Sequence, residues 1–418
     1  MSFNPLRERG IPMEKQFRNW SELNVTPYDK KTVHPYSRTR GILMNGIEVE
    51  AVMFSHTMAR HTVDPKIKQQ LALVRRAEAQ QQKAINWLIP GDETTLEVTL
   101  GYEQVAVDLT AWIAQNEPDA YLKQVYDFGL LEDFDHLYRY ANLYQLLEGK
   151  KAETIVDSLT EITPGRPTIF EHRDPRDEIR RPMTAMAADP QSILNALTVM
   201  SAEQQTMNFY MTIGNRPLEP LARGLYAEIA EIEEQHVSHY ESILDPTATW
   251  FTNLVMHEYN ECWLYWSCLQ TEADPRVKAV YELHLGMEIE HLRLACEMMK
   301  QVEGVDPTEM LPREMPAPMV FQENKDYVRD VLAAQVDLTS KESEFVPLAD
   351  LPKNHRYFEY QKVVNEGGVP SEQVIEEMLR KTGGDYRLET EGPNPVEGLR
   401  SEAERNGAKT GYAKRLAA

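Results

Sequence analysis

The residues from Tyr226 to Tyr240, YAEIAEIEEQHVSHY, combine a helical pattern with two polar side chains that an ordinary hydrophobic core does not hold. Apolar residues recur there every three or four positions, which indicates an amphipathic helix. Glu233 and His236 fall on the same face, because side chains three positions apart project together on successive turns. Burying an unpaired carboxylate costs several kcal/mol, so this segment has to pack against other helices and meet a cation.

Length and composition are those of a globular chain. Its 418 residues leave room for two average domains, and 42% of them are hydrophobic and 26% charged. The formal net charge of -22 argues against a nucleic-acid partner, since phosphates would be repelled. No apolar run reaches the roughly 20 residues that span a bilayer, and the first residues lack an apolar signal region. We therefore expect a cytoplasmic protein without a membrane partner.

The cysteines do not indicate a site of their own. Cys262, Cys268 and Cys296 show no Cys-x-x-Cys spacing. Neither a rubredoxin-type iron centre nor a disulfide framework is therefore expected.

The helical patterns predict an all-α fold with an internal repeat and two terminal arms. Residues 46–149 and 190–304 each carry successive helical patterns with short breaks, and we expect each stretch to form a four-helix unit. Residues 150–189 are rich in Pro and Arg, which predicts a long irregular crossover. Residues 1–45 are expected to form an extended N-terminal arm. Residues 305–418 are expected to hold a linker, one further helix, and an arm that packs on a neighbour or is partly disordered.

The polar residues on the apolar stripes recur when the sequence is shifted by 155 residues. The matched pairs, first copy before second, are Glu48 and Glu203, Glu78 and Glu233, Glu103 and Glu258, Asp133 and Glu288, and His136 and His291. Gln81 is the departure, because it stands where the second copy has His236. Glutamine is a poor metal ligand, so a site that needs position 81 is weakened.

The order of these residues resembles the ferritin-like di-iron or di-manganese carboxylate superfamily, which includes rubrerythrins, bacterioferritins and di-iron oxygenases. Each copy reads Glu, then a Glu-x-x-His or its variant 30 residues on, then the same pair of motifs again. The resemblance implies metal ligands in both copies. In the second copy they are Glu203, Glu233, His236, Glu258, Glu288 and His291; in the first they are Glu48, Glu78, Glu103, Asp133 and His136.

Two arrangements of these ligands are consistent with the sequence. The ferritin-like fold needs a long crossover between its second and third helices, and only 21 residues separate His236 from Glu258. The 150–189 connection is long enough, which favours sites built across the copies. One site would then join Glu103, Asp133 and His136 to Glu203, Glu233 and His236, and the other would join Glu48, Glu78 and Gln81 to Glu258, Glu288 and His291. Alternatively, the second copy holds one intact site and the first a decayed one, since both Gln81 and Asp133 lie in the first copy.

Four carboxylates and two imidazoles balance two divalent ions, so the expected cofactor is two irons per site, or a Mn/Fe or di-manganese pair. The resemblance implies an oxidoreductase that activates dioxygen or peroxide, with an apolar small molecule as substrate, an electron donor that the sequence does not identify, and assembly as a homodimer. An iron-storage protein with ferroxidase activity and a metal-free helical interaction module are the alternatives. The motif also has an explanation without metal, in which the inward acids pair with Arg or Lys between the two copies.

Overall fold

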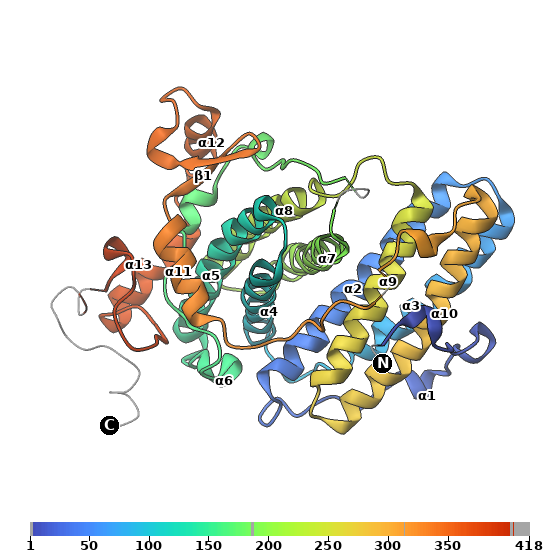
Figure 1. The fold of residues 1–418 in the computed structure, drawn as a ribbon. Helices are drawn as coiled ribbons and strands as arrows, with labels where there is room; N and C mark the ends of the chain where they lie inside the picture. The colour runs from blue at the N-terminus through green and yellow to red at the C-terminus, as the bar shows by residue number, and fades with distance from the viewer. Residues whose placement is uncertain (1–2, 185–187, 313, 402–403, 405–418) are drawn as a thin grey trace. The chain divides into compact units, whose positions relative to one another are not determined.

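The computed structural model describes residues 3–184, 188–312, 314–401 and 404 (Figure 1). The predicted all-α class is confirmed. Within the described residues the chain forms the helices α1 to α13, several short 3-10 turns, and one two-stranded sheet. Two compact units are built from interleaved parts of the chain. Unit 1 combines the chain up to Asp92 with Pro182–Gln205 and Leu244–Phe321; unit 2 combines Glu93–Arg181, Thr206–Ile243 and the chain from Gln322 onward.

Unit 1 is a bundle in which α2 packs on α3 and α9, and α10 packs on α9 and α3 (Figure 1). Its helices are α1 (Trp20–Leu23), α2 (Pro35–His61), α3 (Pro65–Asn86), α9 (Trp250–Thr271), α10 (Pro275–Glu303) and the first part of α7 (Pro190–Ile213). The expectation of an extended arm over residues 1–45 is wrong at its end, because α2 begins at Pro35. His34 caps that helix through its side chain, and Pro35 suits the first turn.

Unit 2 is built around α5, which packs on α4, α8, α11 and α13. Its helices are α4 (Thr95–Asn116), α5 (Ala120–Glu148), α6 (Glu153–Val156), the end of α7, α8 (Pro220–Glu241), α11 (Lys325–Gln335), α12 (Arg356–Val364) and α13 (Pro370–Thr382). Strands β1 (Leu338–Lys341) and β2 (Glu344–Pro347) form an antiparallel hairpin.

The C-terminal segment is more structured than an arm. Beyond the helix expected there, which is α11, it contains the hairpin, α12 and α13. Leu388 then pairs with Ile162 of the crossover through two backbone hydrogen bonds of 2.8 and 2.9 Å. Asn142 of α5 also holds the backbone of Tyr386. The segment therefore packs on its own chain. Residues 402–403 and 405–418, which belong to the expected arm, lie outside the described residues.

Local sequence signals set the helix ends. Thr94 and Glu97 form a capping box at the start of α4, and Asp119 caps α5 through its carboxylate. Gly149 and Gly304 end α5 and α10 with φ of 67° and 70°, a conformation that favours glycine.

The bounds of α3, α4 and α5 recur in α8, α9 and α10 at the same 155-residue shift as the polar residues, with lengths of 22, 22 and 29 residues in both sets.

The compact units divide the chain differently from the segments expected from the sequence. The first stretch of helices is split after Asp92, so α2 and α3 belong with α9 and α10, whereas α4 and α5 belong with α8. Short loops join α2 to α3, α4 to α5 and α9 to α10, so each of these pairs forms an antiparallel helical hairpin. The long connection between α5 and α7 allows helices distant in sequence to share a core. Among the described helices, none is long and apolar enough to cross a membrane.

Candidate metal centres

The buried centre of unit 2 is organised around the carboxylate of Glu233. Its Oε1 lies 3.2 Å from Nδ1 of His136 on α5, and its Oε2 lies 3.3 Å from Nδ1 of His236 on α8. The two imidazole rings are stacked with centroids 5.8 Å apart. Asp133 adds a carboxylate oxygen 3.4 Å from the same His236 nitrogen. One carboxylate thus lies between two imidazoles whose Nδ1 atoms both face inward.

Each imidazole is held from behind by a second carboxylate. Nε2 of His136 lies 2.9 Å from Glu171, and Nε2 of His236 lies 3.0 Å from Glu132. Burial by itself lowers the pKa of His136, but Glu171 and Glu233 outweigh it and hold that pKa well above its ordinary value. With an acceptor at both nitrogens, the metal-free ring carries a proton on each. A metal ion at Nδ1 would replace the inner proton, and the outer proton would stay on Nε2, which donates it to the second carboxylate.

Glu103 of α4 adds a further buried carboxylate to this centre. Glu103, His136 and Glu233 each offer a ligand atom, and these atoms lie within 4.8 Å of one another. Tyr210 of α7 donates its hydroxyl hydrogen to Oε1 of Glu103. The other oxygen, Oε2, has no hydrogen-bond partner among the described residues. Burial raises the pKa of Glu103 well above its ordinary value, and the adjacent Glu233 adds to the effect.

Glu203 is the one predicted ligand of this set that belongs to unit 1. It is buried on α7, three positions before the part of that helix that belongs to unit 2. It lies seven residues before Tyr210, so both side chains project from the same face of the helix. Its assignment as a ligand stays a prediction.

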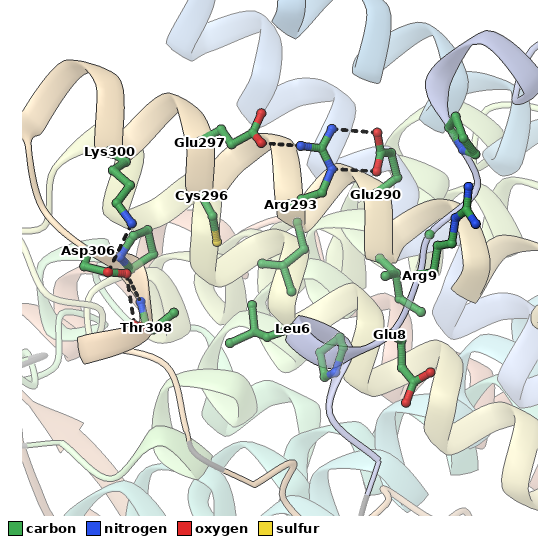
Figure 2. A pocket seen from close by; sticks show the side chains of 16 residues that line it. Leu6, Glu8, Arg9, Glu290, Arg293, Cys296, Glu297, Lys300, Asp306 and Thr308 are labelled. Atoms are coloured by element: carbon green, nitrogen blue, oxygen red, sulfur yellow. Dashed lines mark hydrogen bonds and ion pairs between the residues drawn. The ribbon is translucent and has the colours of Figure 1, made fainter.

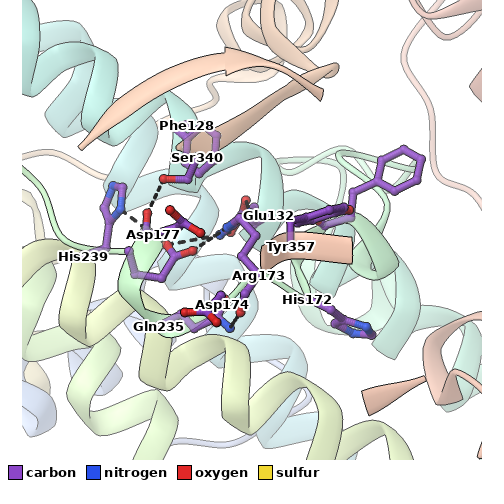
Figure 3. Close-up of polar contacts among 12 residues, drawn as sticks. Phe128, Glu132, His172, Arg173, Asp174, Asp177, Gln235, His239, Ser340 and Tyr357 are labelled. Carbon is purple, nitrogen blue, oxygen red and sulfur yellow. Dashed lines mark hydrogen bonds and ion pairs between the residues drawn. The ribbon is translucent and has the colours of Figure 1, made fainter. Parts of the chain in front are cut away.

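Two buried arginines form an outer layer that the sequence analysis did not identify. Arg166 Nη1 lies 2.7 Å from Glu132 Oε1, and Arg173 contacts both oxygens of Glu132 at 2.5 and 2.8 Å (Figure 3). Burial by itself raises the pKa of Glu132, but Arg173, His236 and Arg166 bring it well below its ordinary value. Both guanidinium groups also stack on the ring of Phe128. Their only sequence signal was the Arg-rich composition of the crossover, because irregular segments have no periodicity that would show which side chains point inward.

The buried centre of unit 1 gathers carboxylates from all four long helices of its bundle. The inward residues are Glu48 on α2, Glu78 and Gln81 on α3, Glu258 and Glu261 on α9, and Glu288 and His291 on α10. Nδ1 of His291 lies 3.0 Å from Glu288, and Nε2 lies 2.6 Å from the amide oxygen of Gln16. Gln81 donates its amide hydrogen to Glu288. These residues lie on α2, α3, α9 and α10, which are the helices that a site built across the two copies would use.

The acids of unit 1 are crowded by one another. Burial raises the pKa of Glu78 to about 7, and although His291 opposes the shift, Glu288 adds to it. Burial followed by neighbouring carboxylates raises the pKa of Glu258 and of Glu261 well above the ordinary range. Burial and Glu288 do the same for Glu48, which also accepts a hydrogen bond from Tyr265. Within the described part of the chain, no ion pair with Lys or Arg reaches any of these acids.

Glu261 is the residue of this centre that sequence reasoning missed. It follows Glu258 by three positions, so it lies on the same face of α9. At the matching position of α4, shifted by 155 residues, stands Ala106. A search for positions shared by both copies therefore passes over it. The spacing Glu-x-x-Glu at 258–261 was the available signal.

Three further buried histidines have partners other than the predicted metal ligands. Nε2 of His239 lies 3.3 Å from the carbonyl oxygen of Val125, and Nδ1 of His257 lies 2.9 Å from Glu50. His284 contacts Tyr265 and Arg18. None of the three is required as a ligand.

Two surface cavities of the described chain are not lined by the buried acids of the two centres. In unit 1 a cavity of about 510 Å³ lies between the N-terminal segment and α10, where Arg293 pairs with Glu290 and Glu297 on the outward side of the helix (Figure 2). Glu288 and His291 face the other way. In unit 2 a cavity of about 320 Å³ is lined by His172 and Gln235, the chain neighbours of Glu171 and His236.

No protein-family model matches this chain, and comparison with curated proteins and with solved structures likewise gave no match. The resemblance to ferritin-like carboxylate proteins therefore depends on the residue pattern alone. What the described residues contain are buried groups of carboxylates and imidazoles that could hold a metal ion.

Proposed function

We propose that unit 2 holds a dinuclear metal centre, with iron as the metal, and that the protein is an oxidoreductase that reduces dioxygen or peroxide there. The observation that carries the proposal is the position of Glu233, whose two oxygens face the Nδ1 atoms of His136 and His236. A carboxylate in that position suits a bridge between two ions, each of which would also bind one imidazole.

The donor set fits two divalent ions of the iron, manganese or zinc type. Imidazole nitrogens favour these metals over calcium and magnesium. Glu103 and Asp133 would be the terminal carboxylates, one from each of α4 and α5. Oε2 of Glu103 is buried and lacks a hydrogen bond from the described residues, which is costly unless a cation or proton meets it.

The chain's own residues prepare this site in three ways. Glu171 and Glu132 hold the Nε2 hydrogens of the two imidazoles, so that the lone pairs at Nδ1 face the centre. Arg166 and Arg173 keep Glu132 ionised, so it remains an acceptor for His236. Tyr210 donates to Glu103 and thereby fixes which oxygen of that carboxylate faces inward.

When bound, a pair of iron ions supplies the two electrons that the reduction of dioxygen to the peroxide level requires. The side chains of the site are buried, which excludes bulk water from the reacting atoms.

The test compares a double variant, Glu233→Ala with His236→Ala, with a control variant at a buried histidine one turn further along α8. The control, His239→Gln, removes a ring that bonds to the Val125 carbonyl. Each protein is loaded with ferrous iron without oxygen, desalted and analysed for metal. Dioxygen consumption is then followed in a closed cell.

We expect the double variant to hold about two fewer irons per chain than the parent protein and to lose the rapid phase of dioxygen consumption. The His239→Gln control should keep both. Full iron occupancy in the double variant would overturn the site. Far more iron per chain than two centres can bind would indicate storage, and a parent protein without bound metal would indicate the interaction module.

A further inference from the structure

We propose that unit 1 is a second metal centre with two unlike positions: one that contains an imidazole, and one built only from oxygen donors that takes a hard divalent cation such as Mn²⁺. The proposal concerns a separate set of residues and does not depend on the reactivity assigned to unit 2.

The imidazole-containing position is formed by Glu78, Glu258 and His291. Each offers a ligand atom, and the three atoms lie within 4.8 Å of one another. The orientation of the ring is fixed by Gln16. The amide nitrogen of Gln16 donates to the Ile11 carbonyl at 2.8 Å, so its oxygen must be the atom that faces His291 Nε2. Nε2 of His291 therefore carries the ring hydrogen, and Nδ1 of His291 is directed inward.

The all-oxygen position is formed by Glu258, Glu261 and Glu288, whose ligand atoms also lie within 4.8 Å of one another. Glu258 belongs to both groups, as Glu233 does in unit 2, and is the natural bridge. Gln81 donates to Glu288 from α3. The amide oxygen of Gln81 is fully buried and has no hydrogen-bond partner among the described residues, which leaves it available to a cation.

Two substitutions distinguish this position from its counterpart in unit 2, and they act together. Gln81 stands where His236 stands in unit 2, so an imidazole is replaced by an amide. Glu261 stands where Ala106 stands, so a carboxylate is added on the facing helix. The loss of a nitrogen donor is thus accompanied by the gain of an oxygen donor. Oxygen-only sets with several carboxylates suit Mn²⁺, Mg²⁺ or Ca²⁺.

A bound cation would also offset the repulsion among the buried carboxylates of this bundle. Five carboxylates, at most 3% exposed, meet one imidazole and no Lys or Arg ion pair in the described chain. Oε2 of Glu258 faces Nδ1 of His291 from 4.0 Å and has no hydrogen bond there. Arg18 contacts His284 at the edge of the cluster, and Arg75 is only half-buried. Charged groups of one sign persist in an interior when ions of the other sign bind between them.

The experiment measures bound Mn²⁺ per chain. The full-length protein is stripped with a chelator, equilibrated with Mn²⁺ alone by dialysis, and analysed for metal and by electron paramagnetic resonance. Four proteins are compared: the parent, Glu261→Gln, Glu261→Asp, and the control Glu50→Gln. The control also removes a buried carboxylate of unit 1, but one that pairs with His257 and belongs to neither group of candidate ligands.

We expect Glu261→Gln to lose about one Mn²⁺ per chain, or to bind it at least tenfold more weakly, whereas Glu261→Asp and Glu50→Gln keep the parent stoichiometry. Equal Mn²⁺ content in the parent and Glu261→Gln would overturn the proposal. Circular dichroism establishes that each variant is folded.

A converse variant keeps the proposal testable if Glu261→Gln does not fold. Gln81→His combined with Glu261→Ala gives unit 1 the donor types of unit 2. We expect its affinity for Mn²⁺ relative to Zn²⁺ to fall at least tenfold, because nitrogen replaces oxygen. An unchanged ratio would contradict the assignment of the all-oxygen position. Neither result depends on dioxygen consumption, so failure here is distinguishable from failure of the function proposed for unit 2.

Discussion

The buried centres of the two units use the same helical spacing but stabilise their acids differently. In unit 2, two imidazoles and two arginines surround the carboxylates, and the pKa values of Glu132 and Glu233 fall below the ordinary range despite burial. In unit 1, one imidazole faces five carboxylates, and the pKa values of Glu48, Glu258 and Glu261 rise. The imidazoles and arginines of unit 2 therefore compensate part of its negative charge, whereas the five carboxylates of unit 1 have one imidazole and need protons or cations from outside.

The outer layers differ as well, and they come from irregular segments. The crossover supplies Glu171 to His136, and the N-terminal segment supplies Gln16 to His291. A carboxylate behind an imidazole makes the ring a stronger donor than a neutral amide does. A shared spacing on helices thus sets where ligands stand, while the segments packed around the bundle set how strongly they bind.

The largest expected difference between the units is in the stability of the metal-free protein. Arg173→Met leaves Glu132 buried with one fewer cation and should destabilise unit 2 by about 3–5 kcal/mol. In unit 1, Glu261→Gln removes one of several repelling acids and should leave the metal-free stability unchanged or higher. Urea unfolding of the chelator-treated variants measures both. Similar losses in the two variants would show that the units are not electrostatically different.

The next effect is on metal affinity through the outer layer. Glu171→Gln should weaken metal binding in unit 2 about 10- to 100-fold, because the ring of His136 loses its anionic partner. Gln16→Leu should weaken binding in unit 1 by less, since it removes only a neutral acceptor. Competition with a calibrated chelator gives both values. A larger effect for Gln16→Leu would reverse the comparison.

The last effect is on pH dependence, and Glu78 differs in sign from Glu132 and Glu233. The pKa of Glu78 is raised to about 7, chiefly by burial, so between about pH 4.5 and 7 the folded chain keeps a proton that the unfolded chain releases. Metal-free unit 1 should therefore lose stability as pH rises through this range, by up to about 1.4 kcal/mol per pH unit. In unit 2, Glu132 and Glu233 have lowered pKa values, so their contribution is lost only as pH falls below about 4.5.

Hydrogen exchange resolved along the chain tests this prediction. After correction for intrinsic rates, α3 and α9 should exchange faster at pH 7 than at pH 5 in the chelator-treated protein, whereas added Mn²⁺ should abolish the difference. Equal exchange rates of α3 and α9 at pH 5 and pH 7 in the chelator-treated protein would contradict it.

The sequence by itself determined the helices and the polar positions on them. Helical periodicity and capping are local, so the all-α class, the position of α11 and the burial of residues such as Glu78 and His291 could be predicted from neighbours within a few turns. The start of α2 at Pro35 was missed because its first turns bury polar residues such as Ser37 and Arg38, which hide the apolar stripe.

Only the tertiary structure decided which helices share a core and which side chains surround each centre. Pairing depends on the reach of the connections and on burial between distant segments, which no local pattern records. That is why Glu132, Glu171 and Arg173 in unit 2, and Gln16 in unit 1, became evident only in three dimensions. The acids of the two centres are alike in sequence, but imidazoles and arginines surround them in unit 2, whereas one imidazole lies among the carboxylates of unit 1.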